Sequence, residues 1–130
     1  MVTASEASIP QKVIVAGARG LIGQHIADRF RLLGIDVLEL DLAIGHDLSC
    51  EAFVREWFAS NPAPALVNAF GLNDHVDEER GASRLMELPL ESFDRFLKLN
   101  VTTLFSVCRE YARNNAAGSI VNFTSVYGLV

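Results

Sequence analysis

The sequence has few cysteines, no excess of positive charge and no long apolar run. Its two cysteines, Cys50 and Cys108, fall within predicted helices, which is typical of small core or helix-surface residues in a reducing compartment. A net charge of −5 argues against nucleic acid or an anionic membrane as the main partner. No stretch approaches the length of a membrane span, and residues 1–10 lack the basic and apolar regions of a signal peptide. We therefore expect a soluble, cytoplasmic protein.

Two common kinds of functional site are also without support. The three histidines, His25, His46 and His75, have no common spacing, so we expect no metal site. A glycine-rich stretch ends at Gly23, but no Lys-Ser or Lys-Thr pair follows it. This absence argues against a P-loop for nucleoside triphosphates.

What the sequence does contain is the pattern of one α/β domain. Half of its 130 residues are hydrophobic, which is enough to form a core. Residues 1–11 resemble a loose leader, and the domain covers 12–130. Apolar patterning predicts strands at 12–16, 36–41, 65–71 and 119–125 and helices at 21–33, 50–60 and 89–115. Strands alternating with helices indicate a Rossmann-like, doubly wound parallel sheet with the first strand central and helices on both faces.

The glycine-rich stretch connects the first strand to the first helix. Gly17, Gly20 and Gly23 are spaced G-x-x-G-x-x-G. In a dinucleotide-binding turn, such glycines permit the tight turn, the approach of the phosphates and close helix–strand packing. The helix N-terminus then directs its free N–H groups at the pyrophosphate. The alternative is an ordinary strand-to-helix turn of another α/β protein.

Asp41, at the end of the second predicted strand, is the candidate ribose ligand. Its carboxylate would accept hydrogen bonds from the adenosine ribose hydroxyls and repel a 2′-phosphate, so we expect NAD(H) rather than NADP(H). Arg19, within the turn, is the counter-argument, because a basic side chain there suits a 2′-phosphate. A solvated aspartate at the end of a strand is the simpler alternative.

The longest predicted helix carries an amide on an apolar stripe. We expect this stripe to face the core, and it consists of Phe93, Phe96, Leu97, Val101, Leu104, Phe105, Cys108 and Tyr111. Asn100 lies on the same stripe, so we expect its side chain to be buried, bonded to backbone or ordered water, and accompanied by a local disturbance of the helix. The preceding polar stretch, 72–88, is either a substrate loop or a solvated insertion, with a short helix expected near 82–87.

Taken together, residues 12–130 resemble the short-chain dehydrogenase/reductase family. The resemblance assigns dinucleotide binding to the turn (Gly17, Arg19, Gly20, Leu21, Ile22, Gly23), to Asp41, to the adenine-contacting pair Asp47-Leu48, and to Asn68-Ala69-Phe70-Gly71 in place of the family's Asn-Ala-Gly motif. It assigns catalysis to Asn100 and Ser125. It implies an NAD(P)-dependent oxidoreductase that interconverts an alcohol and a carbonyl, and the glycine spacing is similar to that of enzymes acting on nucleotide sugars.

The sequence departs from this family in three places. Ala16 stands where threonine is usual, the segment between Asp41 and Asp47 is too short for a crossover helix, and no Tyr-x-x-x-Lys motif is present. In the family that tyrosine is the general acid/base, the lysine lowers its pKa, the serine orients the substrate oxygen and the asparagine holds a water. The resemblance therefore implies a C-terminally incomplete domain that is inactive alone.

Two classes of function follow. The first is an oxidoreductase with a small-molecule substrate, and the second is a non-catalytic dinucleotide-binding or partner-binding module derived from such an enzyme. Candidate surfaces for a homo-oligomer are the helix over 89–115 and the apolar strand over 119–125, which we expect to lie at the edge of the sheet and to be paired or covered.

Overall fold

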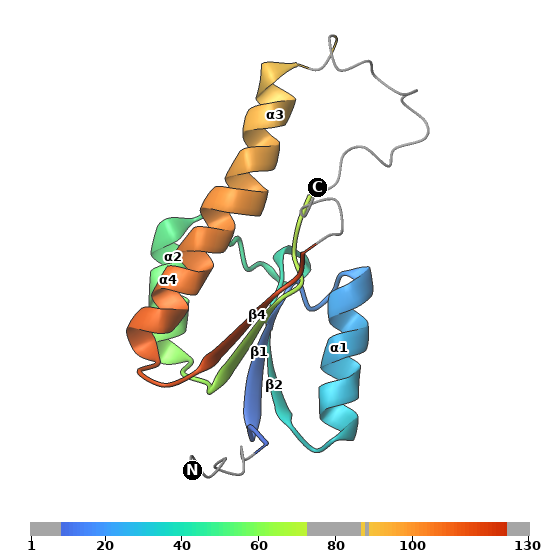
Figure 1. Ribbon diagram of the computed structural model, residues 1–130, viewed down its shortest axis with the longest axis vertical. Coiled ribbons are helices and arrows are strands. Elements are labelled where there is room, and N and C mark those ends of the chain that lie inside the picture. The colour runs from blue at the N-terminus through green and yellow to red at the C-terminus, as the bar shows by residue number, and fades with distance from the viewer. Residues whose placement is uncertain (1–8, 73–86, 88, 125–130) are drawn as a thin grey trace, which may run out of the picture.

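A computed structural model describes residues 9–72, 87 and 89–124. It contains one parallel sheet with the strand order β2-β1-β3-β4, which confirms the predicted fold class and the central first strand (Figure 1). The strands are β1 (Lys12–Ala16), β2 (Asp36–Leu40), β3 (Ala65–Asn68) and β4 (Ser119–Asn122). Because all four run in the same direction, their carboxyl ends lie at one edge of the sheet.

Helices cover both faces of this sheet. α1 (Leu21–Leu32) lies on one face, and α2 (Glu51–Ser60) and α4 (Leu104–Asn114) lie on the other (Figure 1). α4 is the last part of a long helix. The earlier parts of this helix are α3 (Leu90–Leu97) and a π-helical segment (Lys98–Thr103). α3 extends past the carboxyl edge of the sheet and buries none of its residues.

The core follows the alternation of side chains along β1. Val13 and Val15 pack toward α1 with Ala27, whereas Ile14 and Ala16 pack toward α2 and α4. These four side chains are fully buried, whereas Lys12 at the start of the strand is not. Burial on both faces explains why this strand has an uninterrupted apolar sequence.

Tyr111 anchors α4 to the lower part of the core. Its hydroxyl donates to the Ala63 carbonyl oxygen at 3.0 Å, and its ring meets the edge of Phe58 of α2. An ion pair between Arg109 Nη2 and Glu51 Oε1 at 2.6 Å adds a second link between α4 and α2. These contacts hold α4, the C-terminal part of the long helix, against the core. α3, its N-terminal part, extends beyond the sheet.

Several local expectations need correction. The strands predicted at 36–41, 65–71 and 119–125 end earlier, at Leu40, Asn68 and Asn122. The short connection after Asp41 forms a single 3-10 turn, Leu42–Ile44, as its length required. The sequence favours Ser49 as the N-cap of the helix predicted over 50–60. In the structure Cys50 is the residue before α2, and the Ser49 hydroxyl donates to Asp47 instead. Most of the short helix expected at 82–87 lies outside the described residues.

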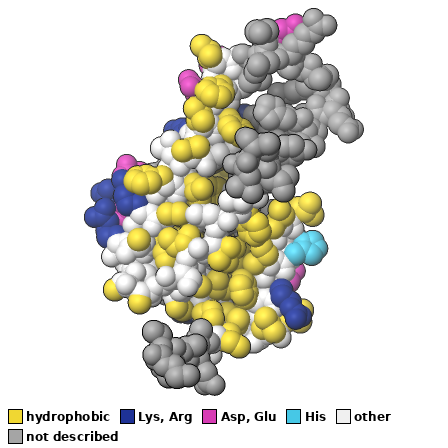
Figure 2. All heavy atoms as spheres, in the orientation of Figure 1, with side chains coloured by type: hydrophobic (Ala, Val, Ile, Leu, Met, Phe, Trp, Pro, Cys, Tyr) yellow, Lys and Arg dark blue, Asp and Glu magenta, His cyan; other side chains and the backbone are white. Residues whose placement is uncertain are grey.

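The apolar stripe of the long helix was wrongly assigned to the core. Only its last member, Tyr111, is buried, while Phe93, Val101 and Phe105 are 50%, 57% and 64% exposed. Figure 2 shows hydrophobic side chains along α3 and over the strands beside α1. On β4 and just after it, Val121 and Phe123 are at least half exposed. Periodicity identified an apolar face correctly, but α3 extends beyond the sheet that would bury it.

No helix in the described part of the chain combines the length and apolar character that a membrane span requires.

Candidate functional site

The predicted dinucleotide residues gather where β1 and β3 end. The turn after β1 contacts the ends of both neighbouring strands: Gly17 N–H donates to the Leu40 carbonyl oxygen at 2.7 Å, and Ala69 N–H donates to the Ala16 carbonyl oxygen at 2.8 Å. Ligands of open α/β sheets bind at this carboxyl edge. The site therefore lies where the fold places such ligands.

Gly17 is the tightest point of the turn. Its φ of +80° is in the left-handed region, and a Cβ there would lie 2.7 Å from the backbone of Ala69 and Phe70. Any side chain would push the turn away from the end of β3. Glycine at this position therefore holds the turn against the segment that carries Asn68 to Gly71.

Gly20 and Gly23 bring α1 close to the turn. A Cβ at Gly23 would lie 1.9 Å from the Gly17 carbonyl oxygen, so only glycine fits there. Gly20 is the N-cap of α1 and provides no side-chain hydrogen bond, and no acidic residue occupies the first helical turn. The first N–H groups of a helix lack partners within the helix and carry partial positive charge. This end of α1, with Leu21 and Ile22 exposed beside it, therefore suits an anion.

Asp41 is joined to the turn by a hydrogen bond. Its Oδ2 accepts from the Arg19 backbone N–H at 2.8 Å, and its Oδ1 accepts from the Ala43 N–H at 2.8 Å. The carboxylate thus caps the 3-10 turn and lies next to the glycine turn. Each oxygen keeps a further lone pair, so the group is still able to accept from a ribose hydroxyl.

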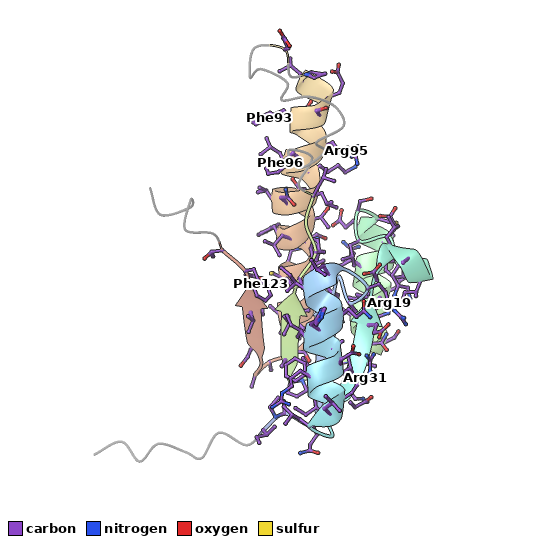
Figure 3. All side chains as sticks on the ribbon, turned by 90° about the vertical axis from the view of Figure 1, so that its right-hand side faces the viewer. Arg19, Arg31, Phe93, Arg95, Phe96 and Phe123 are labelled. Atoms are coloured by element: carbon purple, nitrogen blue, oxygen red, sulfur yellow. The ribbon has the colours of Figure 1, made fainter. Side chains whose placement is uncertain are left out.

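The side chain of Arg19 is bound by Glu39, a residue that sequence reasoning missed. Arg19 Nη2 lies 2.6 Å from Glu39 Oε2, and the other Glu39 oxygen pairs with Arg31. Figure 3 shows Arg19 and Arg31 on the same side of α1. In the sequence, Glu39 is only a charged residue on the same face of β2 as Val37. Its arginine partners come from other parts of the chain, so the pattern of β2 does not reveal them.

The predicted adenine pair is largely occupied by internal contacts. Asp47 Oδ1 accepts from both the backbone N–H and the hydroxyl of Ser49, at 2.9 and 2.7 Å. The Ser49 hydroxyl and N–H lower the pKa of the Asp47 carboxyl, with a smaller contribution from Lys98. The side chain of Leu48 is buried in the core against α2. Whether this pair contacts adenine stays a prediction.

At the end of β3, Asn68 is buried beneath the candidate site. Its Nδ2 donates to Asn122 Oδ1 at 2.8 Å, which links the ends of β3 and β4. Within the described residues its Oδ1 has no hydrogen-bond partner. A buried carbonyl oxygen without a partner among the described residues is energetically costly. Ala69 and Phe70 face the glycine turn with their backbone, as Gly17 requires.

Asn100 holds the segment that follows Gly71. Its Oδ1 accepts from the Leu72 N–H and its Nδ2 donates to the Leu72 carbonyl oxygen, both at 2.8 Å. The expected backbone partner and helix disturbance are confirmed, since Asn100 lies in the π-helical segment. Its side chain is half-buried rather than buried. A π-helical insertion often marks a functional site.

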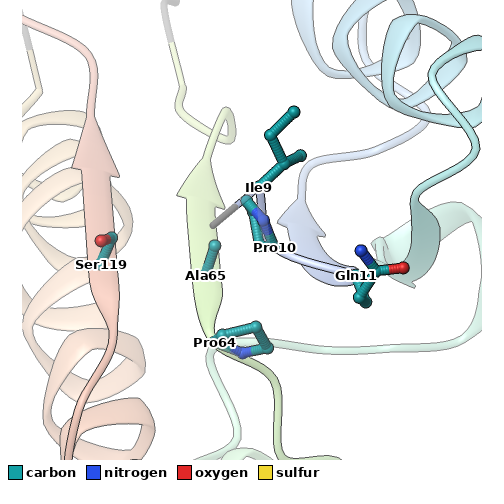
Figure 4. A pocket seen from close by; sticks show the side chains of 6 residues that line it. All are labelled: Ile9, Pro10, Gln11, Pro64, Ala65 and Ser119. Carbon is teal, nitrogen blue, oxygen red and sulfur yellow. The ribbon is translucent and has the colours of Figure 1, made fainter. Parts of the chain in front are cut away.

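Ser125, the other proposed catalytic residue, lies outside the described residues. A pocket of the structure lies at the opposite end of the strands and is lined by Ile9, Pro10, Gln11, Pro64, Ala65 and Ser119 (Figure 4). Its lining contains no titratable side chain and therefore offers no acid or base. Among the described residues, no three His, Cys, Asp or Glu side chains are grouped to hold a metal ion.

Comparison with known proteins gives structural matches only. No protein-family model and no curated protein sequence matches the chain. A short-chain dehydrogenase/reductase from Serratia marcescens BCRC 10948 superposes with a TM-score of 0.65 and 24% identity, covering 85% of this chain and 55% of that one. A small-chain dehydrogenase gives a TM-score of 0.72 at 18% identity, covering 86% and 58%. The chain has the fold of the N-terminal part of the short-chain dehydrogenase/reductases.

A reductase with a different name has a similar fold. A dTDP-4-dehydrorhamnose reductase from Bacillus anthracis str. Ames, solved in complex with NADP, gives a TM-score of 0.63 at 15% identity. That match covers 86% of this chain and 35% of the reductase. The chain therefore spans between about a third and three fifths of the length of the structures it resembles.

Proposed function

We propose that this chain is the dinucleotide-binding part of an NAD(P)-dependent oxidoreductase that interconverts an alcohol and a carbonyl. One observation carries the proposal. The uncapped N-terminus of α1 follows a turn that excludes every side chain at Gly17 and Gly23, and Asp41 is hydrogen-bonded to that same turn. A pyrophosphate-binding helix end beside a ribose-binding carboxylate is the arrangement that a dinucleotide requires.

The proposed cofactor would be held by residues of three segments. The first N–H groups of α1 would bind the pyrophosphate, Asp41 the adenosine ribose, and the segment from Asn68 to Gly71 the remainder of the dinucleotide. The unpaired Asn68 oxygen supports this placement. The cofactor would supply the hydride. Asp41 leads us to propose NAD(H) as the preferred form, with NADP(H) as the alternative.

Catalysis is assigned to Asn100 and Ser125 on the family resemblance. Beyond its two bonds to Leu72, the Asn100 amide has a second N–H and a second lone pair on its oxygen, enough to hold a water for proton transfer. The 130 residues contain no Tyr-x-x-x-Lys motif. We therefore expect dinucleotide binding without hydride transfer by this chain alone. A sugar or sugar nucleotide is the proposed substrate class, in keeping with the glycine spacing.

Calorimetric titration of the purified chain with NADH and with NADPH tests the proposal. We expect saturable binding of both, with NADH tighter, and we expect Asp41→Asn to reduce the preference for NADH. Asp36→Asn, at the other end of β2, removes the same charge and is the matched control. Tighter NADPH binding by the unmodified chain would contradict the role of Asp41, and binding of neither would contradict the function.

The second candidate is a non-catalytic binding module. It is favoured by one feature, namely that the Asn100 amide is bonded to the Leu72 backbone and has a structural role even without catalysis. Both candidates predict no hydride transfer by this chain alone, and an assay of NADH oxidation with carbonyl substrates tests that shared expectation. Turnover by the sequence-verified chain would contradict both the module and the expected need for a tyrosine and a lysine.

A further inference from the structure

Glu39 holds two arginines beside the glycine turn. Its side chain is only 14% exposed, and its two oxygens pair separately with Arg19 and Arg31. Arg31 is also paired with Asp28, Nη1 to Oδ1, at 3.0 Å. Hydrogen bonding to Glu39 is the main cause of the raised pKa of Arg31. The carboxylate is therefore a shared partner for which the two guanidinium groups compete.

Arg19 is joined to Asp41 through its backbone. The Arg19 N–H itself donates to Asp41 Oδ2 at 2.8 Å, so a ribose held by Asp41 would lie beside Arg19. An arginine at this point has the charge and the donors to bind a 2′-phosphate. In the structure its Nη2 instead lies 2.6 Å from Glu39 Oε2.

We propose that Glu39 is a specificity-determining residue that occupies the Arg19 guanidinium and thereby favours NAD(H) over NADP(H). This inference rests on the proposed function. A 2′-phosphate must draw Arg19 away from Glu39, whereas the unphosphorylated ribose leaves the pair intact. Asp41 and Glu39 thus act in the same direction, one by repulsion and the other by competition for the cation.

Arg31 moderates this competition. When Arg19 moves to a phosphate, Glu39 keeps Arg31 and is not left as an unpaired, largely buried charge. Loss of Arg31 would leave Arg19 as the one cation that the described residues place on Glu39, and would strengthen the Arg19–Glu39 pair. Two substitutions on the same cluster are therefore expected to act in opposite directions, which a general change in charge or stability would not produce.

The experiment measures the dissociation constants of NADH and NADPH by calorimetry for the full chain and its variants, after circular dichroism has shown native helix content. For Glu39→Gln we expect NADPH to bind about fivefold more tightly relative to NADH, the effect of losing one partly exposed ion pair. For Arg31→Gln we expect the ratio to shift toward NADH. If Glu39→Gln does not fold, the inference is tested by Arg31→Gln alone, through the expected shift of the NADH-to-NADPH affinity ratio toward NADH.

Two controls separate this role from a general electrostatic effect. Asp36→Asn removes a charge from the other end of β2, where its partner is Lys12, and is expected to leave the ratio unchanged. In the Arg19→Gln background, Glu39→Gln is expected to have no effect on the ratio. Binding with the same ratio in all variants would overturn this inference alone. Binding of neither dinucleotide by any variant would overturn the proposed function as well.

Discussion

At the scale of single residues, Gly17 and Gly34 offer a matched pair. Both have a positive φ, +80° and +75°, but a Cβ at Gly17 would overlap the backbone of Ala69 and Phe70 whereas a Cβ at Gly34 would meet nothing within 4 Å. We expect Gly34→Ala to cost about 1–2 kcal/mol of unfolding free energy from the strained φ alone. Gly17→Ala should cost about 1–3 kcal/mol more and abolish dinucleotide binding. Urea denaturation measures the unfolding free energy of both variants. Equal losses of stability in Gly17→Ala and Gly34→Ala would contradict the close approach of the Gly17 turn to the backbone of Ala69 and Phe70.

Tyr111 gives a pH dependence. Burial raises its pKa above the ordinary value of 10.0, and a hydrogen bond from Ser119 opposes the shift. Between pH 10 and the folded pKa, the unfolded chain loses this proton and the folded chain keeps it, so stability falls as pH rises. Tyr111→Phe removes the hydroxyl and with it the fall in stability above pH 10. The variant also lacks the hydrogen bond to Ala63, so we expect it to be about 1–2 kcal/mol less stable than the unmodified chain at pH 7. Denaturation at pH 7 and pH 11 should show the difference narrowing; a constant difference would contradict the shifted pKa.

Residue patterns explain how much of the site was predictable. The glycine spacing and the apolar β1 predicted the turn, the sheet order and the place of Asp41, because these depend on neighbours in sequence and on general rules of parallel sheets. The predicted N-cap role of Ser49 was wrong, and the role of Glu39 was missed, because each depends on a partner that the fold supplies. Phe93 was placed in the core for a similar reason, since periodicity describes a face and not what covers it.

At the scale of elements, the π-helical segment positions the connection after β3. Asn100→Ala removes both bonds to Leu72 and should cost about 1–3 kcal/mol. Its specific signature is faster hydrogen exchange of the Leu72 amide. Asn114→Ala is the matched control, because it gains the same helix propensity and loses only a local bond to the Glu110 carbonyl oxygen. Unchanged exchange at Leu72 in Asn100→Ala would contradict the positioning role.

At the scale of the whole molecule, β4 forms the outer strand of the described sheet. Its residues are exposed, and apolar surface is presented by Val121 on β4 and by Phe123 just after it. We predict that a second copy of the chain pairs along this edge. Light scattering during size-exclusion chromatography should show an association that increases with concentration and that Val121→Lys weakens. A monomer at every concentration, for the unmodified chain, would contradict this pairing.

The position of β1 in the sheet has a consequence for the order of folding. β1 comes first in the chain but lies between β2 and β3, so it cannot be completed on both sides until both later strands exist. Lys12 pairs with Asp36, a much shorter loop than the one joining Ile14 to Leu66 or Ala65 to Ser119. Because closing longer loops costs more entropy, the β1–α1–β2 unit is the natural nucleus. During synthesis the glycine turn would thus take shape on the ribosome before the strands that complete its surroundings have been translated.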